Sequence, residues 1–174
     1  MERRLTLLQR LDRAARAALP TTLAVVLLVL SGVPLGLPGL RGLAPAFALP
    51  IVFFWSIWRP GLVPPASVFG IGLLADLLGA APLGVTALVL LLLASAVESN
   101  RRRLLRQSAL TTWMYFLVYA AFCQALTWFL ASALSLRLMP VPPVLFQYGL
   151  TVALYPVLAF AMGRADRWLA ELEQ

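Results

Sequence analysis

The stretch Asp76-Leu77-Leu78-Gly79-Ala80-Ala81-Pro82-Leu83-Gly84 joins two long apolar runs, and Asp76 is the one ionisable side chain inside them. A charged side chain within a hydrophobic segment costs about 3 kcal/mol on membrane insertion, so it needs a partner. The small residues and the proline that follow it predict a turn. The stretch therefore predicts two apolar helices joined by a short connection, with Asp76 as a candidate for a functional or partner contact.

The composition identifies the environment of this turn. The chain has 174 residues, of which 61% are hydrophobic, and its mean hydropathy of +0.89 lies well above the usual range of soluble domains. We therefore interpret the chain as an integral membrane protein.

The charged residues exclude a nucleic-acid interpretation. All 14 basic residues are arginines, and with seven acids they give a net charge of +7. The arginines stand at the ends of apolar runs, where the positive-inside rule predicts them, and no basic face is interleaved with polar or aromatic contact residues. We expect no nucleic acid among the partners.

The spacing of the apolar runs predicts an all-α, polytopic membrane protein. A helix needs about 20 apolar residues to cross a bilayer, and Gly, Pro and charged breaks divide the chain into six such spans. They are predicted near residues 19–36, 43–58, 62–79, 83–98, 109–133 and 142–163. Together they form a six-helix membrane domain over 18–168, followed by a cytoplasmic tail at 169–174.

The N-terminal residues 1–17 carry leucines at helical spacing and five arginines mostly away from that stripe. This pattern predicts an interfacial amphipathic helix, with a solvated basic tail as the alternative. With the N-terminus inside, twelve arginines lie on the cytoplasmic side, and only Arg41 and Arg137 lie outside. That asymmetry indicates an even number of spans and both termini in the cytoplasm.

On the third predicted span, Gly72, Asp76 and Gly79 fall on one helical face. Asp76 lies about one turn from the outer end, where backbone amides near Leu83 and Gly84 could stabilise it. Pro82 is expected in the first turn of the next helix, and helix N-termini attract anions. Two roles stay open for Asp76: an intramolecular clip of the hairpin, or a contact to a partner helix or an outward cavity.

Two further positions are candidates for structural hinges or partner contacts. Arg59 ends the second span within Trp58-Arg59-Pro60, and Pro156 is expected to kink the sixth span because it removes one backbone hydrogen bond. The run Arg101-Arg102-Arg103 is interpreted as a topology determinant, with Glu98 placed to pair at i+3 or i+4. A docking surface for a cytosolic partner or an anionic lipid is the alternative.

The sequence offers little for catalysis. It has no histidine, Asp76 has no second acid inside the membrane, and the single cysteine, Cys123, lies in an apolar run and is interpreted as packing. We predict no enzymatic activity, no catalytic residue, no metal site and no cofactor.

The motifs together resemble those of one known family. The order runs from Trp55-Ser56-Ile57-Trp58-Arg59-Pro60 through the Asp76–Gly84 turn to Tyr155-Pro156, and it resembles the MreD family of bacterial rod shape-determining proteins over essentially the whole chain. The most specific part is a turn of the type Asp-x-x-x-Gly-x-Pro-Leu-Gly. This chain departs from it, since Gly79 comes three residues after Asp76 and Ala80-Ala81 follow.

The resemblance implies a non-catalytic component of the cell-elongation complex in the bacterial inner membrane. It implies MreC as the main partner and, through the complex, RodA, a class B penicillin-binding transpeptidase, RodZ and MreB. The family's fold is similar to that of the S components of ECF-type vitamin transporters, which gives the alternative function of a substrate-binding transporter subunit. The spacing of Ala14 and Ala18 and the composition of the outer loops give little support to that alternative.

Overall fold

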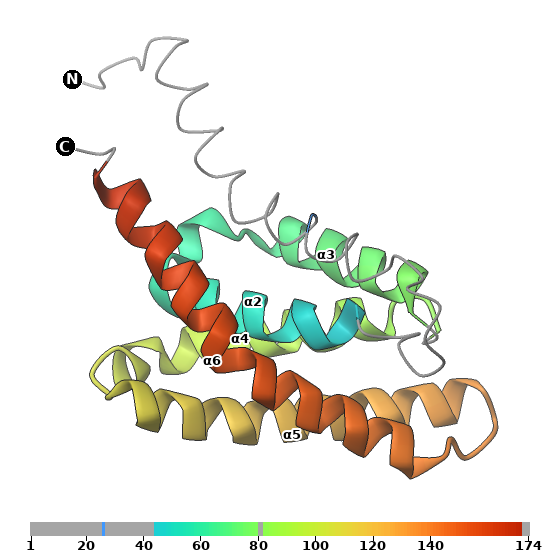
Figure 1. Cartoon of the computed structure of the whole chain (residues 1–174). Coiled ribbons are helices and arrows are strands. Elements are labelled where there is room, and N and C mark those ends of the chain that lie inside the picture. Colours follow the sequence, from blue (N-terminus) through green and yellow to red (C-terminus); the bar gives the residue numbers. More distant parts are fainter. Residues whose placement is uncertain (1–25, 27–43, 80–81, 172–174) are drawn as a thin grey trace, which may run out of the picture.

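The computed structural model describes residues 26, 44–79 and 82–171 (Figure 1). Within these residues the chain is helical and has no strand, which confirms the all-α prediction for this part. The elements are α2 (Ala44–Trp58), a 3-10 turn η1 (Pro60–Leu62), α3 (Pro65–Leu78), α4 (Val85–Leu104), α5 (Ala109–Leu134) and α6 (Val141–Glu171). The predicted N-terminal helix at 1–17 and the first span at 19–36 lie outside the described residues, apart from residue 26.

Proline and polar residues set most helix boundaries. Pro60 opens η1 and Pro65 is the first residue of α3, where a missing N–H costs nothing. Ser108 caps α5, because its hydroxyl oxygen accepts a hydrogen bond from the amide of Thr111 at 3.3 Å. These ends lie within a few residues of those expected from the sequence.

Two boundaries differ from the prediction. α4 continues through the arginine run to Leu104 and does not end at residue 98. Arginine is a good helix former, and positive charge is favourable in the last turn of a helix. α6 likewise extends to Glu171, beyond the predicted end at 163, and it continues through Pro156 as one helix.

The α2 helix forms the centre of the core. It packs against α3, α4 and α6, and its side chains from Ala48 to Ile57 are almost all buried. The Phe53 ring packs against Phe116 of α5 and Tyr155 of α6, with centroid distances of 5.1 and 5.8 Å, and Phe116 and Tyr155 stack at 4.1 Å. A helix that is apolar all round fits this central position.

The outer helices expose apolar side chains. α5 and residues 141–164 of α6 are long and apolar enough to cross a membrane, while α2 and α3 are shorter apolar helices. Large side chains such as Val118, Phe122 and Phe160 are more than 60% exposed. Such a surface suits contact with lipid or with other membrane helices.

Candidate functional site at the α3–α4 hairpin

The carboxylate of Asp76 binds the start of the next helix. Its Oδ2 accepts a hydrogen bond from the Gly84 amide at 2.8 Å, and its Oδ1 accepts one from the Thr86 amide at 3.0 Å. The side chain is only 3% exposed. The first amides of a helix lack intrahelical partners and carry partial positive charge, so a carboxylate is well matched to them. The donors expected near Leu83 and Gly84 are thus found at Gly84 and Thr86.

Gly84 sets the geometry of this contact. It precedes the first residue of α4 with a φ of +92°, a left-handed conformation that glycine adopts at little cost. This conformation turns the chain so that its own amide and that of Thr86 both reach Asp76. The expectation that Pro82 lies in the first turn of α4 is wrong: α4 begins at Val85, and Pro82 lies in the preceding turn, where its carbonyl accepts from the Val85 amide.

Gly72 holds the two helices close together one turn away from Asp76. A β-carbon at this position would lie 2.3 Å from the Cα of Ala87 in α4, far inside van der Waals contact. Small residues let helix backbones approach in this way, which matters where lipid provides no hydrophobic drive for association. Gly72, Asp76 and Gly84 therefore meet at the α3–α4 interface.

Of the remaining candidate residues, Gly79 belongs to the hairpin, and Arg59 and Pro156 lie elsewhere. Gly79 caps the end of α3, with its amide donating to the Asp76 carbonyl at 3.3 Å. Arg59 stands between α2 and η1, and Pro156 lies within α6 beside the buried Tyr155. The structure does not bring Arg59 or Pro156 to the hairpin.

An arginine that sequence reasoning assigned to topology makes a specific contact. Arg101 of α4 donates from Nε to the Ile57 carbonyl at 2.6 Å and from its second terminal nitrogen to the Trp58 carbonyl at 3.5 Å. These carbonyls belong to the last turn of α2, which has no intrahelical donors for them. The expected pair with Glu98 is therefore wrong for Arg101. Its position among three arginines gave no signal that would single it out.

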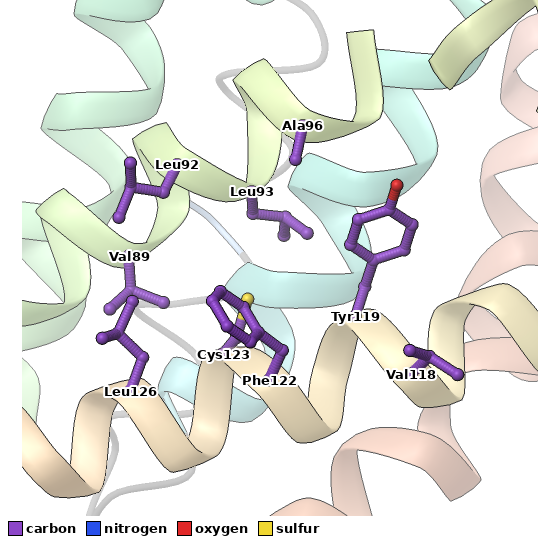
Figure 2. A pocket seen from close by; sticks show the side chains of 9 residues that line it. All are labelled: Val89, Leu92, Leu93, Ala96, Val118, Tyr119, Phe122, Cys123 and Leu126. Carbon is purple, nitrogen blue, oxygen red and sulfur yellow. The ribbon is translucent and has the colours of Figure 1, made fainter. Parts of the chain in front are cut away.

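A groove between α4 and α5 lies apart from the hairpin (Figure 2). Its volume is about 230 Å³. Nearly all of its surface is apolar, and the lining residues are Val89, Leu92, Leu93, Ala96, Val118, Tyr119, Phe122, Cys123 and Leu126. Within the described ranges no group of three or more His, Cys, Asp or Glu side chains could hold a metal ion.

The apolar outward faces and long apolar helices define a helical membrane protein built around a tightly closed hairpin. The family profile described as rod shape-determining protein MreD matches residues 12–165, which is most of the chain. The chain therefore belongs to the MreD family, and its role is in determining rod shape. No curated protein and no solved structure matches the chain.

Proposed function

We propose that this protein is a non-catalytic scaffold of the cell-elongation complex in the bacterial inner membrane, where it binds MreC. Through MreC it helps to couple the cytoskeleton to peptidoglycan synthesis. The family match over residues 12–165 is the observation that carries this proposal. We further propose six spans with both termini in the cytoplasm, and an arrangement like that of ECF-type S components.

The geometry of the hairpin supports a structural role for Asp76. Both carboxylate oxygens are used by amides of the same chain, and the side chain is buried. Asp76 with Gly72, Gly79, Pro82 and Gly84 would then fix the outer half of the bundle without touching MreC directly.

A better surface for a partner helix lies on α6. Gly149, Ala153, Val157 and Phe160 follow one another at helical spacing and are all exposed. A β-carbon at Gly149 would meet no atom within 4 Å. Paired small residues on an outward face permit close approach of a second transmembrane helix. We propose this face as the MreC contact.

Co-purification of MreC with tagged full-length protein tests the assignment. Gly149→Leu should block close approach and reduce MreC recovery, while leaving the fold intact because the new side chain points into open space. Gly70→Leu is the matched control, since Gly70 is also exposed and also has no neighbour within 4 Å. Equal recovery of MreC with both variants and with wild type would show that α6 is not part of the interface. Loss of MreC with Gly70→Leu alone would place the interface on α3.

The same experiment covers Asp76 and the transporter alternative. Asp76→Asn and Asp76→Ala at matched expression should lower MreC recovery only as far as they lower the amount of folded protein. If both Asp76 variants bind MreC as well as wild type does and the cells keep their normal width, Asp76 serves only to stabilise the hairpin. Recovery of an ATPase-coupled transport module in place of MreC would contradict the scaffold proposal and favour the S component.

A further inference from the structure

An exposed arginine of α4 lies beyond one end of the groove between α4 and α5. Leu92 and Ala96 line the groove, and Arg103 lies on the same face of α4, seven residues beyond Ala96. Seven helical residues span about 10 Å. Because α4 and α5 are joined by the short turn after Leu104, this end of the groove is also the end with the arginine run.

The three consecutive arginines differ in what they are free to bind. Arg101 is engaged by the last carbonyls of α2. The side chains of Arg102 and Arg103 are exposed, and within the described part of the chain neither guanidinium forms a hydrogen bond or an ion pair. One residue step on a helix is about 100°, so Arg102 points away from the groove line while Arg103 continues it.

The α5 side of the groove adds a polar group at the same end. Figure 2 shows Tyr119 reaching from α5 toward α4, with its hydroxyl on the Ala96 side. This hydroxyl has no hydrogen bond to any described residue. Tyrosine rings with a free hydroxyl are favoured where an apolar region meets the polar head-group layer.

We propose that the α4–α5 groove is a binding site for an anionic glycerophospholipid, with one acyl chain between Leu92 and Phe122 and the phosphate at Arg103. An apolar groove with an unpaired guanidinium about two helical turns beyond it, on the same face of α4, matches an amphiphile whose head carries negative charge. The groove suits a chain and not a partner helix, since a helix is about 10–12 Å across with its side chains and cannot enter about 230 Å³. The site does not depend on MreC binding.

Native mass spectrometry of the purified full-length protein, with equal amounts of phosphatidylglycerol and phosphatidylethanolamine, measures lipid retention. Arg103→Gln should weaken phosphatidylglycerol binding about fivefold, and Arg102→Gln, which removes the same charge from another face, no more than about twofold. Ala96→Leu fills the groove and should reduce retention of phosphatidylglycerol with Arg103 intact. Equal effects of Arg102→Gln and Arg103→Gln would overturn the site and leave diffuse attraction.

Photolabelling of the wild-type protein by a lipid is a second measurement of the site. Phosphatidylglycerol with a photoreactive group in its acyl chain should label α4 near Leu92 and α5 near Phe122 in the wild-type protein. Labelling spread equally over the exposed face of α6 would overturn the proposal. The lipid proposal would also be overturned if Ala96→Leu left lipid retention unchanged but abolished the co-purification of another protein, because the groove would then be a protein contact.

Discussion

Gly72 of α3 lies so close to Ala87 of α4 that a β-carbon on the glycine would be 2.3 Å from the alanine Cα. The neighbouring atom is backbone, which cannot rotate out of the way. The contact therefore sets the spacing of the two helices. It also brings the start of α4 within reach of Asp76, because the two positions are separated by about one turn of α3.

Gly72→Ala should destabilise the protein more than substitution at any other described glycine within α3. Overpacking of a helix interface typically costs about 1–3 kcal/mol, and a clash with backbone belongs to the upper end. Unfolding in a titration of denaturing detergent, followed by tryptophan fluorescence, measures the loss. Gly70→Ala is the control: its β-carbon would enter open space, so it should be neutral or stabilise the helix by up to about 1 kcal/mol. Equal stability of the two variants would show that the helices can separate freely.

Replacing Asp76 should release the start of α4. Asp76→Ala removes the acceptors for one buried amide, that of Thr86, and one partly buried amide, that of Gly84, at about 1–3 kcal/mol for each unsatisfied group and less for the partly exposed one. Asp76→Asn keeps one carbonyl oxygen and should lose about half as much. Hydrogen exchange at the Gly84 and Thr86 amides reports the change directly. Wild-type protection of both amides in Asp76→Ala would contradict the proposed clip.

Gly84→Ala tests the left-handed turn separately from the carboxylate. A β-carbon meets no neighbour there, so the cost comes only from the positive φ and should be about 1 kcal/mol. Gly84→Asn should cost less, since asparagine tolerates this conformation. Gly61→Ala, at another glycine with open space and no positive φ, should change the free energy of unfolding least.

Local chemistry made the hairpin predictable from sequence. Three features of the sequence place the amide donors near Gly84: a carboxylate that is costly to bury without partners, a turn composition after it, and the expected start of the next helix. The structure has these donors at Gly84 and Thr86. The prediction for Pro82 is wrong because the preference of proline for the first turn of a helix is only statistical. In this chain Gly84 stands immediately before α4, and its left-handed conformation leads the chain into the helix.

Contacts between distant segments were not predictable in the same way. Phe53, Phe116 and Tyr155 come from three helices, and no periodicity says that their rings meet. Arg101 bonds to Ile57 across 44 residues. To predict this contact, one would have to know that the ends of α2 and α4 lie side by side, and that depends on the packing of the whole bundle.

Arg101→Gln should therefore weaken the junction of α2 and α4. A hydrogen bond from a charged group contributes about 1.5–3 kcal/mol when buried, and partial exposure of this guanidinium lowers the expectation to about 1–2 kcal/mol. Arg102→Gln is the matched control, because it removes the same charge from a side chain that forms no hydrogen bond or ion pair with the described residues, and it should stay within about 0.5 kcal/mol of wild type. Arg101→Lys should restore part of the loss, since an ammonium can reach one carbonyl but lacks the fork that spans Ile57 and Trp58. The detergent titration measures all three, and equal destabilisation by the two glutamine variants would mean that the arginine run acts only through its total charge.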